Sequence, residues 1–168
     1  TELLRGVAEP TEQLFKPASL APAARLLEAS EAFTSRSARA DELLRGLTSE
    51  LPGAVVTCIE AAELELQPEL QQLLLRAAAY GKCYLPSTNQ GDGGGGGGSA
   101  AGAAESRESA LFVRACKRIR LLNAVRQPEV GLLLTAAQYD ALGPQRLLLR
   151  LLAQQHHLLA LRLAQFLR

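Results

Sequence analysis

The chain has 168 residues, of which 48% are hydrophobic, and its formal net charge is +1. This near-zero charge gives no electrostatic case for binding nucleic acid or an anionic membrane surface. Leu and Ala carry most of the apolar share, and the aromatic residues are three Tyr, four Phe and no Trp, which favours helices over sheets.

The first half predicts three helices, each introduced by a proline, because proline is tolerated in the first turn of a helix. A long helix should begin near Pro22, with a buried stripe at Leu26, Leu27, Phe33, Leu43, Leu44 and Leu47. The next should begin at Pro52-Gly53, with Val55, Val56, Ile59, Ala62 and Leu66 at helical spacing. The third should begin at Pro68, with a stripe of Leu70, Leu73, Leu74, Ala77 and Ala78. Gly81 falls just past that stripe, where a left-handed C-cap is expected.

A glycine run interrupts the helical pattern. Gly93 through Gly98 are six consecutive glycines flanked by Ser, Ala, Asn and Asp. Such a segment cannot bury enough apolar surface to offset its ordering entropy, so residues 86–108 are predicted to be a low-complexity, disordered insert. A phosphate-binding loop is disfavoured, because no lysine follows the glycines as that motif requires.

The second half predicts four further helices. The first has a stripe of Leu111, Val113, Cys116, Ile119, Leu122 and Val125, and it should end before Pro128. Residues 130–134 form an apolar connector that could be extended and buried. Thr135 is a good N-cap for a short helix through Leu142, and Gly143-Pro144 should separate it from the next. The last two helices, the second beginning around Gln155 or His156, are led by Leu147, Leu148, Leu151 and Leu152 and by Leu158, Leu159, Leu161, Leu163 and Phe166.

Together these elements predict an all-α fold, an irregular α-solenoid of antiparallel helices without a fixed-period repeat. Residues 1–85 would form its first helices, residues 86–108 the insert, and residues 109–168 its continuation. The first residues resemble neither a signal peptide nor an initiator sequence. No apolar run approaches the roughly 18 residues of a membrane span. We therefore expect a soluble piece of a longer chain.

Side chains that could carry chemistry are present but scattered. Cys58, Cys83 and Cys116 have no CxxC pairing, so they are expected to be reduced, buried thiols. His156 and His157 are adjacent, and their side chains would point about 100° apart on a helix, which is poor geometry for one metal. The remaining candidates form an acidic cluster that is typical of a solvated helix face: Glu60, Glu63 and Glu65. We predict no catalytic site, no metal site and no cofactor.

Asn123 is unusual because it lies within a Leu-rich helix for which it has poor propensity. Arg126 is three positions further on and shares its face. The pair could contact a partner, or it could form a hydrogen bond between helices that fixes their packing. The second interpretation is favoured because buried polar groups are normally paired.

Several colinear blocks carry a family resemblance. They are residues 18–29, 58–62, 67–78, 81–83, 121–126 and 131–139. Their order and most of their spacings resemble the vacuolar protein sorting-associated protein 16 family, over roughly residues 11–168. Two blocks are the most specific, and their roles as structural or interface positions are open: Gly81, Lys82 and Cys83, and Leu122, Asn123, Ala124, Val125 and Arg126.

The resemblance implies a large, non-enzymatic subunit with a β-propeller followed by an α-solenoid, this chain being the region just after the propeller. Such subunits are core parts of the HOPS and CORVET tethering complexes, which hold endosomal and vacuolar or lysosomal membranes together before SNARE-driven fusion. The implied partners are other tethering subunits and a Sec1/Munc18-type SNARE-binding protein, whose docking surface would lie C-terminal to this chain. The implied location is cytoplasmic and peripheral on late endosomes and vacuoles or lysosomes, with no cofactor, small molecule or nucleic acid.

Three positions depart from the family pattern. Residues 86–108 stand where a compact linker is usual, Leu133 where the family tends to carry Pro, and His157-Leu158 where an aromatic–Pro pair is usual. One alternative is a solenoid adaptor of a related trafficking or coat complex. The other is a small helical enzyme or nucleic-acid binder, which the missing catalytic constellation and the near-zero charge disfavour.

Overall fold

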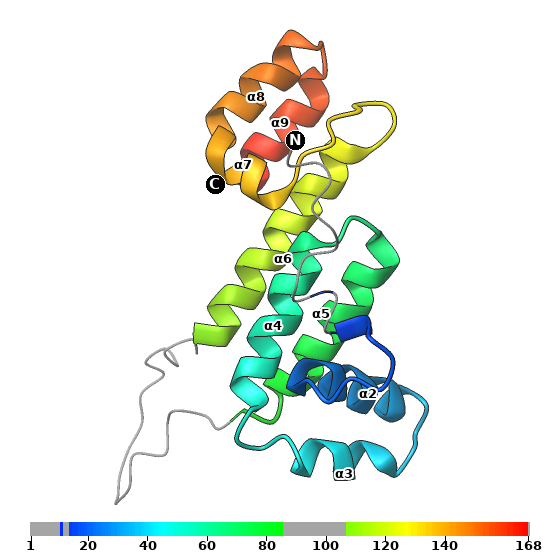
Figure 1. Ribbon diagram of the computed structural model, residues 1–168. Helices are drawn as coiled ribbons and strands as arrows, with labels where there is room; N and C mark the ends of the chain where they lie inside the picture. Colours follow the sequence, from blue (N-terminus) through cyan, green and yellow to red (C-terminus); the bar gives the residue numbers. More distant parts are fainter. Residues whose placement is uncertain (1–10, 12–13, 86–106, 168) are drawn as a thin grey trace, which may run out of the picture. The chain divides into compact units, whose positions relative to one another are not determined.

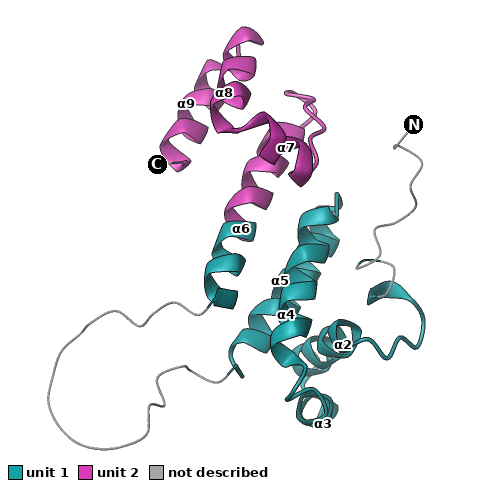
Figure 2. Ribbon diagram, turned by 60° about the vertical axis from the view of Figure 1, so that its left-hand side comes forward, with its two compact units in different colours: residues 1–115 teal, residues 116–168 magenta. Residues whose placement is uncertain are grey.

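The computed structural model describes Thr11, residues 14–85 and residues 107–167. Regular structure within these residues consists of eight helices, labelled α2 to α9 in Figure 1, which confirms the all-α prediction. The predicted insert, residues 86–108, lies mostly outside the described residues, although its last two residues belong to a helix that begins at Arg107. Contacts divide the chain into two compact units, Thr1–Ala115 and Cys116–Arg168, coloured separately in Figure 2.

Three helices of the first unit carry a proline at their start, as predicted. They are α2 (Pro22–Thr34), α4 (Leu51–Leu64) and α5 (Pro68–Lys82), each with Pro in its first two positions. Proline suits these positions because its missing N–H would have no partner inside the helix. The prediction of helix starts near Pro22, Pro52 and Pro68 is therefore confirmed.

The single long helix predicted from Pro22 through Leu47 is wrong. The chain leaves the helix after Thr34, Arg36 adopts φ 55°, and a separate helix, α3 (Arg39–Arg45), follows. Thr34 donates a side-chain hydrogen bond to the carbonyl four residues earlier, and Ser35 donates one to the carbonyl three residues earlier. Such bonds are an alternative that Ser and Thr offer to helix propagation. Phe33, assigned to the buried stripe, is 59% exposed as a result.

The core of the first unit is built from small and branched side chains of α2, α4 and α5, which pack against one another. Its buried members include Leu26, Ala29, Val55, Cys58, Ile59, Ala62, Leu74, Ala77 and Ala78, and Leu47 from the turn between α3 and α4 is buried as well. Leu66, predicted to belong to the α4 stripe, lies beyond the end of that helix and is exposed. Gln71 is buried in this core, and its amide Nε2 donates to the Glu65 carbonyl at 2.8 Å, so its polar group is satisfied.

Gly81 is not the left-handed C-cap that its position predicts. It lies within α5, which continues to Lys82, and it is buried. A Cβ at this position would lie 2.7 Å from Cγ2 of Val55 and 2.9 Å from Cδ2 of Leu26. The glycine is therefore required by close helix packing rather than by backbone conformation.

The breaks between the helices of the second half lie at the predicted residues. Helix α6 (Arg107–Arg126) ends before Pro128, and α7 (Ala136–Leu142) is preceded by Thr135. Thr135 and Gln138 form a capping box, in which each side chain bonds the other residue's backbone N–H. Gly143 has φ 76° and separates α7 from α8 (Pro144–Ala153). The last helix, α9 (His157–Phe166), has His156 as its N-cap, in agreement with the predicted start.

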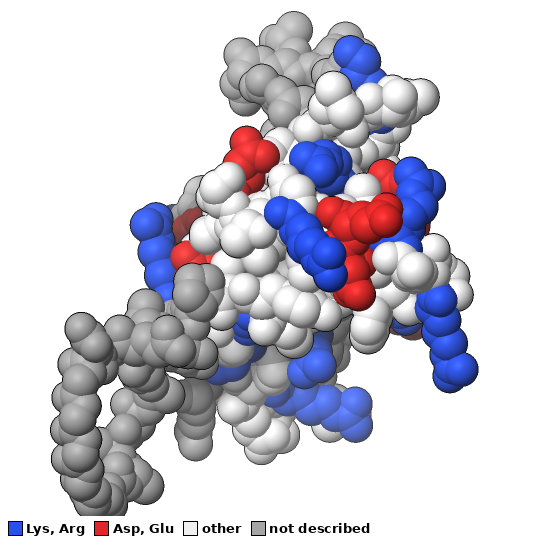
Figure 3. All heavy atoms as spheres, turned by 90° about the horizontal axis from the view of Figure 1, so that it is seen from below, with Lys and Arg blue, Asp and Glu red and all other residues white. Residues whose placement is uncertain are grey.

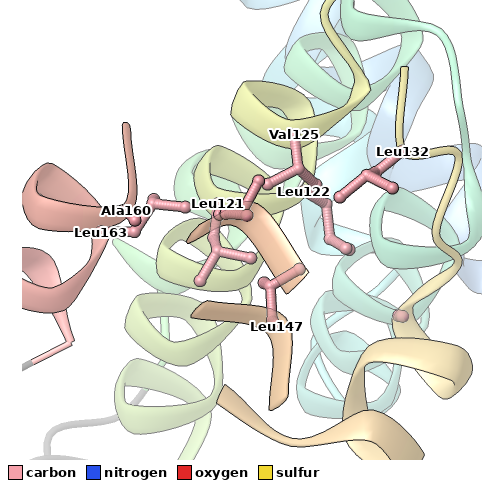
Figure 4. Packing of buried hydrophobic residues seen from close by; sticks show 9 residues of the cluster. Leu121, Leu122, Val125, Leu132, Leu147, Ala160 and Leu163 are labelled. Atoms are coloured by element: carbon pink, nitrogen blue, oxygen red, sulfur yellow. The ribbon is translucent and has the colours of Figure 1, made fainter. Parts of the chain in front are cut away.

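The core of the second unit joins α6, the connector after it, α8 and α9. Figure 4 shows Leu121, Leu122 and Val125 of α6 with Leu147 of α8, Ala160 and Leu163 of α9, and Leu132 of the connector. Three expectations are corrected. In the connector Leu132 is buried but Leu133 is 80% exposed. In α9 the buried residues are Ala160 and Leu163, whereas Leu158, Leu161 and Phe166 are exposed, because they lie on other sides of the helix. Val113 of α6 is likewise exposed.

Candidate functional site

The first of the two specific blocks, Gly81-Lys82-Cys83, closes α5. Gly81 faces Val55 and Leu26 in the core. The Lys82 ammonium lies 4.6 Å from the ring centroid of Phe112 in the first turns of α6, a cation–π contact between two helices of the first unit. The Cys83 side chain is exposed, and its Sγ donates to the Ala79 carbonyl at 3.4 Å. The block thus has one packing residue, one residue that tethers α6, and one exposed thiol.

An aromatic cluster that sequence reasoning missed lies beside this block. The rings of Phe33 and Tyr80 are 5.0 Å apart, and those of Tyr80 and Tyr84 are 5.2 Å apart in an edge-to-face arrangement. Burial, with a smaller contribution from Tyr84, raises the pKa of Tyr80 to about 12. The i, i+4 spacing of the two tyrosines was a readable signal. Phe33 joins them from α2, across the contact between α2 and α5.

The second block, Leu122 to Arg126, combines packing and polar contacts. Leu122 and Val125 are buried in the core of the second unit, while Asn123 and Ala124 are half-buried. Arg126 donates to the Leu134 carbonyl through Nη2 at 2.7 Å and Nε at 3.0 Å, and through Nη1 to Oδ1 of Asn123 at 3.3 Å. Partial burial lowers the pKa of Arg126. These bonds run within α6 and from α6 to the connector, so Arg126 fixes the connector that leads into α7.

The three cysteines occupy different environments. Cys58 is fully buried in α4, where desolvation raises its pKa to about 12. A thiol with that pKa stays protonated at neutral pH and is a poor nucleophile. Cys83 is exposed and Cys116 is partly buried. The expectation that the cysteines are buried is confirmed for Cys58 and wrong for Cys83.

The histidines and the acidic cluster do not converge. His157 Nε2 lies 2.8 Å from Oε1 of Gln155. Glu65 accepts from the backbone N–H groups of Leu66 and Gln67, at 2.8 and 3.2 Å, and so shapes the turn before α5. Glu60 is exposed on α4. Across Thr11, residues 14–85 and residues 107–167, no three His, Cys, Asp or Glu side chains are grouped so that they could hold a metal ion.

Charge is distributed rather than concentrated. On the face drawn in Figure 3, acidic and basic side chains lie next to one another. Arg39 pairs with Glu28 at 3.0 Å on the surface of the first unit. Arg118 of α6 pairs with Asp140 of α7, and its side chain is largely buried. Within the described part of the chain, no helix is long and apolar enough to cross a membrane.

Comparison with known proteins gives consistent matches. Residues 1–92 match the family model described as "Vps16, N-terminal region". The chain is 39% identical over 99% of its length to "Protein VACUOLELESS1" of Arabidopsis thaliana, covering 17% of that protein. It is 34% identical over its whole length to the "Vacuolar protein sorting-associated protein 16 homolog" of Dictyostelium discoideum, covering 18% of it. The "Vacuolar protein sorting-associated protein 16" of Saccharomyces cerevisiae is 31% identical over 89% of the chain, with 16% of the yeast protein covered. The chain thus spans less than a fifth of these relatives.

Proposed function

The chain belongs to the Vps16 family, and on that premise we propose that it is a non-catalytic scaffold segment of a subunit that acts in vacuolar protein sorting. The observation that carries the proposal is the match of more than half the chain to the family model, together with full-length similarity to relatives named for vacuolar sorting. In this proposal the full-length protein is a core subunit of the HOPS and CORVET tethering complexes. It works with the other subunits and a Sec1/Munc18-type protein, peripherally on late endosomal and vacuolar or lysosomal membranes.

The proposed mechanism is geometric. Residues 14–85 and residues 107–167 contribute successive packed helices. Stacked helices with dense apolar cores resist deformation, so they hold more distant binding surfaces at a fixed spacing. The polar side chains with the best-defined contacts support this view. Arg126, Gln71 and Thr135 each bond backbone groups of connectors and helix ends, which is a structural use of their chemistry.

Complementation tests the scaffold role against a chemical one. In cells that lack the endogenous protein, full-length protein carrying His156→Ala, His157→Ala and Glu60→Gln should restore delivery of a vacuolar cargo, because no chemistry is assigned to these groups. Gly81→Leu should fail, because it forces apart α2, α4 and α5. If the first variant folds and assembles normally but leaves cargo unsorted, the scaffold proposal is wrong.

A further inference from the structure

Exposed cations form a stripe along α6. Arg114, Lys117 and Arg120 follow one another at intervals of three residues, and all three are exposed. At about 100° and 1.5 Å per residue, they occupy an arc of about 120° and a length of about 9 Å on this helix. Arg107 is also exposed, lies about 20° from Arg114, and extends the stripe to about 20 Å. These four residues, the cationic stripe, are placed by the geometry of a single helix.

The only carboxylate of α6 lies on the opposite side of the helix. It belongs to Glu108, about 180° around the axis from Lys117. The residues that pack into the protein are on that side too, since Ala115 and Ile119 are buried and lie about 160° from Lys117. Helix α6 therefore has a packed, apolar side and an outer side on which every charged group is positive.

The stripe differs from the other cations of the same helix. Arg118 pairs with Asp140, and Arg126 donates to the Leu134 carbonyl. In the part of the chain that the structure describes, the side chains of the stripe form neither an ion pair nor a hydrogen bond. Like charges three residues apart destabilise a helix, so the exposed face of α6 retains repulsion between its side chains. A negatively charged partner would replace this repulsion with attraction.

The composition of the stripe selects among anionic partners. Helices that bind membrane surfaces combine cations with a large apolar face that enters the bilayer. The apolar side of α6 is instead buried within the protein, and Val113 is its only large apolar side chain that is exposed. Sites for single-stranded nucleic acid add aromatic rings on which bases stack, and none lies in the stripe. A protein segment that carries carboxylates fits the stripe better than either.

Three of the four stripe residues are arginines, whose paired N–H donors fit a carboxylate. A helix with Asp or Glu at intervals of three and four residues presents a row of carboxylates of the same length. We propose that the cationic stripe of α6 is a docking surface for such an acidic helix of a partner protein. Exposed ion pairs are individually weak and are screened by salt, so the contact guides association and is salt-sensitive.

Fluorescence anisotropy with the purified full-length protein tests this proposal. The probe is a synthetic helical peptide with glutamates along one face. It should bind at least about tenfold more weakly to the variant with Arg114→Glu, Lys117→Glu and Arg120→Glu, because three attractions become repulsions. A peptide with lysines in place of the glutamates should bind that variant more tightly than it binds the unchanged protein. Unchanged amide exchange at the buried Ala115 and Ile119 checks that the variant is folded.

The charge-matched control carries Arg45→Glu, Arg76→Glu and Arg146→Glu, at exposed positions of three other helices. It should bind the acidic peptide within about twofold of the unchanged protein. Equal weakening by the two variants would show that net charge alone is responsible and would overturn the proposal. So would a stripe variant that still binds the acidic peptide but no longer binds phosphatidylserine vesicles, which would identify a membrane surface instead. The assay contains no other sorting subunit, so its failure leaves the proposed function standing.

Discussion

Gly81 on α5 and Val55 on α4 are in such close apposition that a Cβ on the glycine would lie 2.7 Å from Cγ2 of the valine. Leu26 of α2 closes the same space from a third helix, at 2.9 Å. Real Cβ atoms do not approach other carbons this closely, so any side chain at Gly81 must displace buried groups. One position therefore sets the distance between the three principal helices of the first unit.

Gly81→Ala should destabilise the first unit by about 1–3 kcal/mol, the usual cost of overpacking, despite the better helix propensity of alanine. The measurement is amide exchange of α4 and α5, which reports their local free energy of opening. A second substitution, Val55→Ala, should recover part of the loss because it removes the clashing methyl groups.

Gly53→Ala is the matched control for this prediction. Gly53 also lies in a helix of the first unit, but a Cβ there meets nothing within 4 Å. This change should be neutral or stabilise by up to about 1 kcal/mol, because alanine is the better helix former. Equal effects at the two glycines would contradict the packing explanation.

Arg126→Ala should destabilise the second unit by about 1–3 kcal/mol, because the half-buried Leu134 carbonyl loses two charge-assisted donors. Exchange of the amides of residues 130–134 and of α7 should increase most. Arg120→Ala, at an exposed position of the same helix, should have little effect. An Arg126 variant with unchanged exchange in the connector would refute its anchoring role.

Thr135→Ala should cost about 1 kcal/mol by removing the side-chain acceptor of the Gln138 N–H. Thr135→Ser keeps a hydroxyl at the cap and should retain most of the stability. Denaturant unfolding followed by circular dichroism compares the three proteins. If the serine variant were as unstable as the alanine variant, the lost methyl group rather than the cap would be responsible.

The burial of Cys58 predicts a pH dependence. Its pKa is about 12 in the folded protein against 9.0 for an unperturbed thiol. Above pH 9 the unfolded chain therefore loses a proton that the folded chain keeps, so stability falls as pH rises from 9 towards 12, by at most about 1.4 kcal/mol per pH unit.

Urea unfolding between pH 8 and pH 10 measures this slope. Tyr80 adds a slope of the same sign as the pH approaches 10.0, its unperturbed pKa, because its pKa in the folded protein is about 12, so the difference in slope between the unchanged protein and Cys58→Ala isolates the thiol. Cys58→Ala should be less stable at pH 8, because it leaves a small cavity, yet lose less stability as the pH rises. Cys83→Ala, at an exposed thiol, should retain the slope of the unchanged protein. Parallel slopes for all three proteins would contradict the assignment to Cys58.

Much of the fold could be predicted from the sequence, because several helix starts are set by residues near them in the chain. Pro22, Pro52 and Pro68 mark helix starts, and Thr135 with Gln138 marks another, because each acts through its immediate neighbours in the chain. The features that could not be predicted depend on contacts between residues that are far apart in the sequence. Gly81 follows the local rule for a C-cap, but Val55 and Leu26, far away in sequence, make it a packing residue.

The same distinction applies to the candidate site. Arg126 was singled out from the sequence, but its acceptor was not predicted. That acceptor is the backbone carbonyl of Leu134, and the position of a backbone atom cannot be inferred from the residue type. The aromatic cluster was missed because Phe33 was assigned to the buried stripe of its helix, whereas it is largely exposed and its ring packs against Tyr80. Exposed leucines on α9 look like core residues in a periodicity pattern, because the pattern does not indicate which of two faces is occupied.

The most direct test of the account is quantitative affinity purification of the full-length protein from its own cells, with the stoichiometry of every co-purifying protein measured. The account predicts stoichiometric recovery of several propeller–solenoid tethering subunits with a Sec1/Munc18-type protein, and loss of that recovery with Gly81→Leu but not with Gly53→Ala. Recovery without such subunits, or with coat proteins in their place, would contradict the tethering role while leaving the helical fold intact.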